Sequence, residues 1–396
     1  MENKKHALLS ASGASRWLEC TPSARLEETL PKKSSSYADE GTAAHDLCEL
    51  AAQYFLGEIT RKKYDAGVTK FKKTNAQYYS AEMMECAEDY GQVIAETVNT
   101  MRVDCPDTVV ELEAKSLDFS EWAPEGFGTG DCIIVADDLL EIIDFKYGKG
   151  VRVEAYNNPQ MRLYALGAIK RYGDLYDIKR VRMSIIQPRI NREPSTEEMT
   201  LNELLDWAET YVKPRAALAY AGEGEFSPTE DACKFCRAKE QCKARADKNL
   251  ALFDEAPEVL LITPDEAGEI LEKAADIKAW LKDLESLVTK TLFDGASVEG
   301  WKLVEGRSNR KLGDEEKIVE AMVEAGIDNA EIYTRSLITL TAMEKAYGKK
   351  KLAEILGDLI TKPLGKPTLA PASDKREAFS PEGAILDAFD DGEDFE

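Results

Sequence analysis

Two short apolar segments that each carry an acidic residue constrain the fold of this chain most strongly. They span residues 128–135 (GTGDCIIV) and 140–146 (LEIIDFK), and only a short turn separates them. Such a pattern predicts two neighbouring strands. Side chains of a strand return to one face at every second residue, so Asp144 and Lys146 should share a face. We therefore expect Asp131, Asp144 and Lys146 to meet at one edge of a sheet.

Two carboxylates beside an ammonium group form a suitable site for a hard divalent cation and a phosphate. The alternative is a surface hairpin whose charges are simply solvated. A third carboxylate could come from the preceding strand, expected at 108–117, where Glu111 and Glu113 alternate with apolar residues. Alternation puts both glutamates on one face and Val110, Leu112 and Ala114 on the other, so either glutamate could contribute.

Two helices are expected to bring further polar side chains. Pro159 marks the first turn of a helix at 158–171, in which Gln160 and Tyr164 are four residues apart and share a face. Such a pair can hold a phosphate, a base or a carboxylate, although ordinary surface polarity would also explain it. His45 lies in an amphipathic helix expected at 41–56. Its role could be structural, but imidazole is also a common ligand of divalent metals, including Mn²⁺.

The order of these motifs is similar to that of a known nuclease superfamily. The series G-x-x-x-H, Glu, G-x-x-D, D-x-K and Q-x-x-x-Y resembles the RecB-like branch of the PD-(D/E)XK nucleases, over roughly residues 7–245. Residues 9–25 and 300–310 further resemble an uncharacterised family of phage and prophage proteins assigned to that superfamily. The matching residues are Gly41, His45, Glu113 (or Glu111), Gly128, Asp131, Asp144, Lys146, Gln160 and Tyr164.

The resemblance implies an α/β fold with a restriction-endonuclease-like mixed central sheet flanked by helices. It also implies a Mg²⁺- or Mn²⁺-dependent deoxyribonuclease, first of all an exonuclease acting on DNA ends or single strands in phage replication or recombination. An endonuclease for branched or flapped DNA is the nearest alternative. A catalytically silent scaffold that binds DNA or a recombinase is another.

The same resemblance implies a role for each matching residue. Asp131, Asp144 and the carbonyl of Phe145 would hold the metal, with Glu113 and His45 as further ligands. Lys146 would orient the attacking water or stabilise charge on the phosphoryl oxygens. Gln160 and Tyr164 would position the DNA strand.

Three of the eight cysteines, Cys233, Cys236 and Cys242, are spaced as metal ligands but lack a fourth partner. We expect Cys20 to complete the set, with Cys48 as the alternative. RecB-like nucleases of the AddB, Cas4 and Dna2 type carry a 4Fe–4S cluster on one cysteine before the nuclease core and three after it. The resemblance thus implies a 4Fe–4S cluster; four thiolates would also suit Zn²⁺.

The compartment expected from these features is reducing. The N-terminus has no signal-peptide pattern, and no apolar run is long enough to span a bilayer, so we expect no membrane association. Together with the resemblance, this predicts the cytoplasm of a bacterial host cell.

A net charge of −23 argues against a protein that coats DNA indiscriminately, because phosphate backbones attract cationic surfaces. Net charge does not describe local patches, however, and one basic segment spans residues 61–73. Two further helices are expected, near 78–104 and at 200–222, and strands at 129–136, 140–147 and 180–188.

Three domains are expected: a nuclease domain at 1–250, a mainly helical domain at 258–361 that starts with a long helix at 264–294, and an acidic tail at 362–396. Phe389 and Phe395 lie among acidic residues of this tail. The pattern is similar to the acidic tips with which single-strand-binding proteins recruit partners. A phage single-strand-binding or annealing protein is therefore an expected partner; a disordered solubilising tail is the alternative.

Overall fold

The computed structural model describes residues 7–31, 36–254 and 263–304, and isolated positions between 323 and 356. The chain divides into two compact units, Met1–Trp301 and Lys302–Glu396. The expected tail at 362–396, the start of the expected second domain at 258 and most of that domain beyond residue 304 lie outside the described residues. The domain boundaries and the partner of the tail therefore stay predictions.

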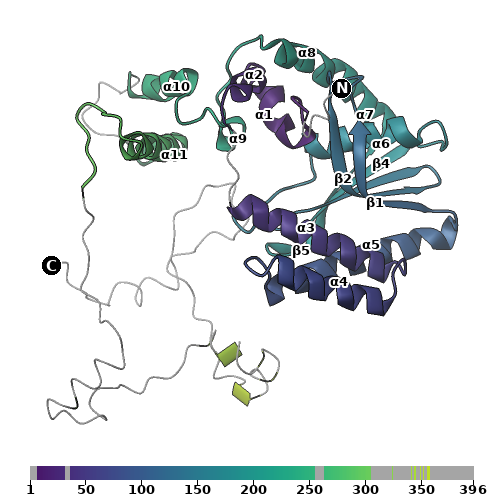
Figure 1. Ribbon diagram of the computed structural model, residues 1–396. Coiled ribbons are helices and arrows are strands. Elements are labelled where there is room, and N and C mark those ends of the chain that lie inside the picture. The colour runs from purple at the N-terminus through teal and green to yellow at the C-terminus, as the bar shows by residue number, and fades with distance from the viewer. Residues whose placement is uncertain are drawn as a thin grey trace. The chain divides into compact units, whose positions relative to one another are not determined.

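A five-stranded mixed sheet forms the centre of the first unit (Figure 1). Its order follows the sequence, from β1 to β5, and only the β3–β4 pair is parallel. This confirms the expected α/β class with a mixed sheet flanked by helices. The strands are β1 (Val109–Asp118), β2 (Phe127–Ala136), β3 (Leu139–Phe145), β4 (Arg180–Gln187) and β5 (Asn191–Thr200).

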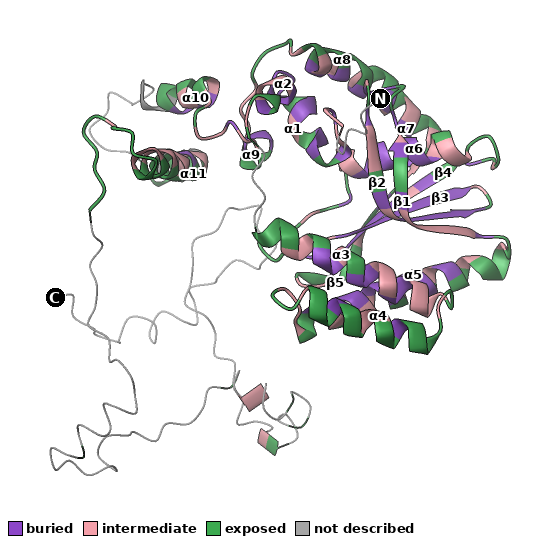
Figure 2. Cartoon of the chain, in the orientation of Figure 1, coloured by how far each residue is buried: buried purple, intermediate pink, exposed green. Residues whose placement is uncertain are grey.

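Helices cover both faces of the sheet, and each face has its own apolar core (Figure 2). On one face lie α3 (Ser36–Phe55), α4 (Arg61–Thr74) and α5 (Ala81–Asp104). The helices on the other face are α1 (Ala14–Glu19), α2 (Ser23–Glu28), α6 (Pro159–Tyr172), α7 (Leu201–Trp207) and α8 (Lys213–Ala221), with the short helical turns Ala11–Gly13 and Ala208–Val212. In β2, Ile133 and Val135 face the α6 core, whereas Cys132 and Ile134 face the α3 core.

Strand β1 does not keep the alternation that its sequence predicts. Val110 and Leu112 pack against the α3 core, but Ala114 and Leu117 belong to the α6 core. The change of face occurs at Glu113, whose φ is 49°, and the β1–β2 register shifts just beyond it. The prediction that Ala114 shares a face with Val110 and Leu112 was therefore wrong, because a bulge reverses the phase of a strand in a way that a period-two pattern cannot show.

Local signals account for α6, which connects the parallel strands β3 and β4, and for β5, which follows them. Asn158 caps α6 by accepting hydrogen bonds from the backbone N–H groups of Gln160 and Met161, and Pro159 occupies the first turn. Strand β5 was not expected, because it contains Pro194 and several charged residues. Proline is tolerated there since β5 is an edge strand and Pro194 falls where the β4–β5 register shifts.

The remaining helices of the unit are α9 (Glu230–Lys234), α10 (Lys243–Asp254) and α11 (Pro264–Phe293). The helix expected at 264–294 is α11, and it packs on α10. The buried guanidinium of Arg245 joins the two helices through Asp283, at 2.6 Å, and Asp276, at 3.5 Å. Within the described residues, no helix has both the length and the apolar character that crossing a bilayer requires.

Contact between α6 and β1 depends on a helical glycine, Gly167. A Cβ added at Gly167 would lie 2.8 Å from Cβ of Leu117 and 2.9 Å from its carbonyl carbon. We expect Gly167→Ala to lower the free energy of unfolding by about 1–3 kcal/mol, because overpacking outweighs the higher helix propensity of alanine. Urea denaturation measures the change.

The matched control is Gly41→Ala in α3, where an added Cβ meets no atom within 4 Å. This variant should keep or slightly raise the stability. Equal effects of the two substitutions would contradict the close packing of α6 on β1.

Candidate active site

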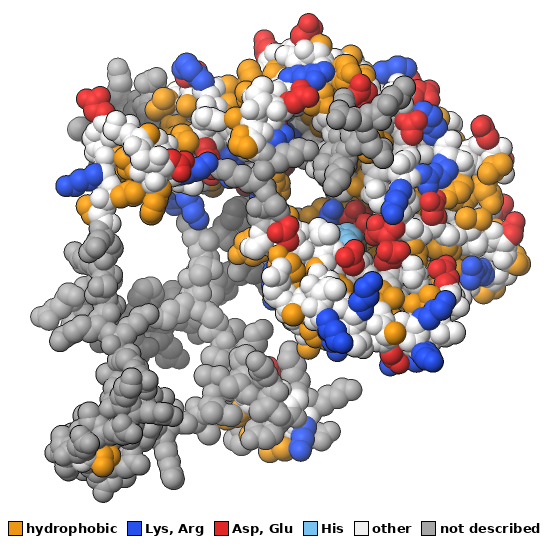
Figure 3. All heavy atoms as spheres, viewed as in Figure 1, with side chains coloured by type: hydrophobic (Ala, Val, Ile, Leu, Met, Phe, Trp, Pro, Cys, Tyr) orange, Lys and Arg blue, Asp and Glu red, His pale blue; other side chains and the backbone are white. Residues whose placement is uncertain are grey.

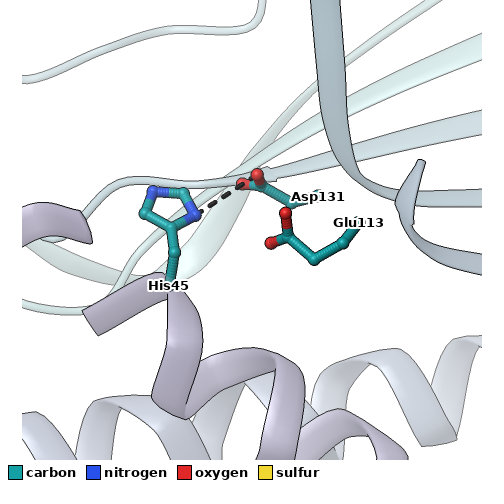
Figure 4. A group of neighbouring side chains, drawn as sticks. All are labelled: His45, Glu113 and Asp131. Carbon is teal, nitrogen blue, oxygen red and sulfur yellow. Dashed lines mark ion pairs between the residues drawn. The ribbon is translucent and has the colours of Figure 1, made fainter. Parts of the chain in front are cut away.

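One cluster of potential metal ligands lies where α3 approaches the middle of β1 and β2 (Figure 4). One ligand atom each from His45, Glu113 and Asp131 lies within 4.8 Å of the other two. Nδ1 of His45 is 3.2 Å from Oδ1 of Asp131. Among the described residues, these three form the only such group of histidine, cysteine or carboxylate side chains.

The backbone brings the two acids together. Leu112 pairs with Cys132 and Ala114 with Gly130, so Glu113 lies opposite Asp131 in the β1–β2 ladder. The positive φ of Glu113 is a conformation that side chains other than glycine rarely adopt. Strain of this kind is concentrated at functional sites, where the surrounding structure enforces it.

Asp131 is also tied to β3. Its Oδ2 accepts a hydrogen bond of 2.7 Å from the backbone N–H of Phe145. Phe145, the residue after Asp144, therefore contacts this cluster through its backbone N–H. The hydrogen bond holds the β2 carboxylate against the end of β3 and leaves Oδ1 for His45.

A buried acid–lysine pair lies beside this cluster. Asp144 is only 3% exposed, and Nζ of Lys146 lies 3.0 Å from its Oδ2. This ammonium is the charged partner of the buried carboxylate. A buried carboxylate oxygen is well suited to a cation.

Helix α6 supplies the two polar side chains that the sequence placed on one face. Nζ of Lys146 donates to Oε1 of Gln160 at 3.3 Å, and Nε2 of Gln160 donates to the hydroxyl of Tyr164 at 3.0 Å. The ring of Tyr164 packs over Gly128, where an added Cβ would lie 2.6 Å from Cε1. A chain of contacts thus runs from Asp144 through Lys146 and Gln160 to Tyr164.

Negative charge is crowded in this site, as the pKa shifts show. Burial, with the neighbouring charge of Asp131, raises the pKa of Glu113 from 4.5 to about 7. Burial also raises the pKa of Asp144, against the opposing effect of Lys146. For His45 and Lys146, burial lowers the pKa, but contacts with Asp131 and Asp144 respectively outweigh it and leave both raised. A bound cation would relieve this excess of acid.

The structure separates the two glutamates that the sequence left as alternatives. Both carboxylate oxygens of Glu111 accept hydrogen bonds from Arg171, at 2.6 and 2.8 Å, and one also accepts from Tyr172. Glu111 thereby anchors α6 to β1 and lies apart from the cluster, whereas Glu113 is part of it.

Gln187 is a contributor that the sequence did not single out. This buried side chain donates to the carbonyls of Gly148 and Val151 and accepts from the N–H of Val153. It therefore organises the loop that follows Lys146. In the sequence, its position at the end of a buried strand, just before Pro188, could have identified it.

The four expected cysteine ligands lie around one small cavity of about 20 Å³. It is lined by Cys20, Cys233, Cys236 and Cys242. Cys48, the alternative fourth ligand, is instead packed in the α3 core.

This chain matches one protein family and is distantly similar to two solved structures. The profile of a family described as "Protein of unknown function (DUF2800)" matches residues 6–377, and the chain belongs to this family. A solved structure of a candidate exonuclease from Eubacterium rectale is 13% identical, with a TM-score of 0.30; the match covers 66% of this chain and 91% of that chain. LHK-Exo in complex with dAMP is 14% identical, with a TM-score of 0.22, over 46% of this chain and 93% of that chain. Likenesses this low carry no activity over to this chain.

The crowding at Glu113 leads to a stability prediction. In metal-free protein above pH 7, Glu113→Gln should raise the free energy of unfolding, because the neutral amide removes a charge that burial and Asp131 disfavour. For a fully buried group, the pKa shift of Glu113 would correspond to about 3 kcal/mol. Because Glu113 is partly exposed to solvent, we expect the free energy of unfolding to rise by roughly 1 kcal/mol. The gain should disappear below pH 4.5, where Glu113 is protonated in folded and unfolded protein alike.

Urea denaturation in EDTA at about pH 4 and pH 8, on either side of both pKa values, tests this prediction. The matched control is Glu111→Gln, two residues away on the same strand, which should lower the stability by roughly 1 kcal/mol because it weakens the contact with Arg171. A loss of stability in both variants would mean that Glu113 is an ordinary structural residue.

Proposed function

We propose that this protein is a metal-dependent DNA nuclease of the RecB-like branch of the PD-(D/E)XK superfamily. The observation that carries the proposal is the convergence of His45, Glu113 and Asp131 beside the buried Asp144–Lys146 pair. Exonuclease action on DNA ends or single strands is the first form of the proposal. A role in phage replication or recombination, in the cytoplasm of a bacterial host cell, belongs to the same proposal.

The donor set fits Mg²⁺ or Mn²⁺. Glu113, Asp131 and Asp144 offer carboxylate oxygens, which hard cations prefer, and His45 adds an imidazole that Mn²⁺ accepts. A bound cation supplies Lewis acidity, which lowers the pKa of a coordinated water and neutralises charge on the scissile phosphate. The carbonyl of Phe145 remains part of the proposed ligand set on the strength of the resemblance alone.

The residues around this set have distinct tasks. Lys146, held between Asp144 and Gln160, places a positive charge where negative charge builds up on the phosphoryl oxygens. Burial raises the pKa of Tyr164, so its phenol stays protonated and can donate a hydrogen bond to a phosphate. Gln160 orients both groups and would hold the DNA strand beside the cluster with Tyr164.

A silent scaffold with the same fold is the competing function. It would bind DNA or a recombinase without cleaving it. The strained backbone of Glu113 and its raised pKa favour an enzyme, because a scaffold gains nothing from a conformation and a charge arrangement that both lower stability.

Cleavage assays with matched variants test the enzyme directly. Wild-type protein should degrade end-labelled linear DNA with Mg²⁺ or Mn²⁺ and stop in EDTA. Asp144→Asn, Lys146→Met and Glu113→Gln should each reduce the rate by about 100-fold or more, because each removes a charge that acts on the reacting phosphate. Glu111→Gln should keep the wild-type rate, since its carboxylate binds Arg171.

Circular, flapped and RNA substrates in the same assay separate exonuclease from endonuclease action and DNA from RNA preference. Undiminished cleavage in Asp144→Asn and Glu113→Gln would contradict the proposed site. Absence of cleavage by wild-type protein with every substrate and metal would favour the scaffold.

A 4Fe–4S cluster on Cys20, Cys233, Cys236 and Cys242 is the second part of the proposal. The four thiols line one cavity, and their arrangement along the chain matches the one before and three after the core that the resemblance implies. A cluster there would join the segment before the sheet to the segment after it. Zinc is the alternative occupant.

Metal analysis of anaerobically purified protein tests the cluster. Cys233→Ala should lower the iron content and the melting temperature together, because metal binding contributes directly to folding stability. Cys105→Ala, at a half-exposed cysteine that does not line the cavity, should change neither. Zinc in place of iron in wild-type protein would contradict the cluster and support the alternative.

A further inference from the structure

Helix α4 presents a strongly basic surface on an acidic protein. Its 14 residues, RKKYDAGVTKFKKT, contain six basic residues and one acidic residue. Tyr64 and Phe71 are buried on the inner side of the helix. The opposite side carries Lys62, Lys70 and Lys73, whose spacing places them on one exposed stripe. Figure 3 shows Lys and Arg side chains gathered over α4, with acidic side chains gathered above them in this view.

The basic residues of α4 fall into two groups. Arg61 is 2.9 Å from Asp65 and lies over the rings of Tyr54 and Tyr64, and Lys72 lies over the ring of Tyr79. These contacts are internal to the fold. Lys62, Lys63, Lys70 and Lys73, in contrast, form no ion pair within the described part of the chain, so their charge is available to a partner.

A groove borders the lysine stripe at Lys70. It has a volume of about 300 Å³ and runs between α3 and α4. Lys70 and Asn75 line its α4 side, and Asp46 and Glu49 line its α3 side. Asp46 follows His45 directly, so the α3 side of the groove belongs to the same helical turn as the candidate metal ligand.

We propose that the stripe of Lys62, Lys70 and Lys73, beside the α3–α4 groove, binds the phosphate backbone of a polynucleotide. The inference rests on the proposed nuclease function for the fate of the bound polynucleotide. The binding surface itself is argued from charge and position alone.

Electrostatics explains why such a surface is needed. The protein carries a net charge of −23, and the site itself is rich in carboxylates, so a polyanion is repelled until it meets a local excess of positive charge. Flexible lysines on a helix face neutralise phosphates without reading bases. Binding through this stripe should therefore be independent of base sequence and sensitive to salt.

The test measures binding without catalysis. Fluorescence anisotropy with a labelled 20-nucleotide single strand and a 20-base-pair duplex is recorded in EDTA over a series of salt concentrations. For wild-type protein we expect measurable affinity that falls steeply with salt. For the triple variant Lys62→Ala, Lys70→Ala, Lys73→Ala we expect an affinity at least tenfold lower, and a salt slope that is smaller by about 2 for the single strand or about 3 for the duplex.

The matched control removes three exposed lysines from another helix. Lys278, Lys282 and Lys290 lie on α11, are exposed and form no ion pair in the described residues. Replacing them with alanine changes the net charge by the same amount as the α4 variant, so affinity and slope should stay close to the wild-type values. Melting temperatures of all three proteins show whether folding is intact.

Each outcome separates this inference from the nuclease proposal. Loss of binding in the α4 variant alone supports the surface, even if no protein cleaves DNA with any metal. Equal affinity and salt slope in wild type and the α4 variant would overturn the proposed binding surface. An equal loss of affinity in the α4 and α11 variants would overturn it too. In either case, cleavage by wild-type protein would still support the nuclease proposal. Absence of polynucleotide binding by wild type also overturns the inference.

Discussion

The side chain of Asp131 is the contact on which the candidate site depends. One oxygen accepts from the N–H of Phe145 and the other contacts His45, while Glu113 lies across the β1–β2 ladder. One carboxylate therefore links α3, β1, β2 and β3 at a single point. The hairpin holds Asp131 and Asp144 in register, and α6 adds Gln160 against Lys146. Rigid elements on both faces of the sheet thus support a group of charges that would otherwise repel one another.

The crowded acidic residues of the candidate site lower the stability of the fold locally, and this loss of stability points to a functional role. The φ of Glu113 is unfavourable, burial and Asp131 raise its pKa to about 7, and burial raises the pKa of Asp144 in spite of the nearby Lys146. Glu111, two residues away, shows the contrast: its carboxylate is satisfied by Arg171 and Tyr172 and stabilises the packing of α6. Sites that hold uncompensated charge are the ones prepared for a ligand.

The cysteine cavity has a different role, because it joins segments far apart in the chain. The hydroxyl of Thr21 donates to the carbonyl of Glu223, and Glu27 accepts from Arg16 and from the N–H of Arg237. Cys20 is thereby held beside the segment that carries the other three cysteines. Arg245 extends the contact to α11. The two ends of the sheet domain are thus tied together by polar contacts, around a cavity that a metal centre would reinforce.

The sequence by itself determined the features that depend on neighbouring residues. The hairpin with its acids, the capped start of α6, the shared face of Gln160 and Tyr164 and the spacing of three cysteines are all local, so period and turn chemistry reveal them. Tertiary structure alone placed Glu113 rather than Glu111 beside His45 and Asp131, and Cys20 rather than Cys48 at the cavity of the other three cysteines, and it admitted the proline-containing edge strand β5. A bulge that reverses a strand and a cysteine more than 200 residues from its partners are set by packing between distant segments, and no local pattern records that packing.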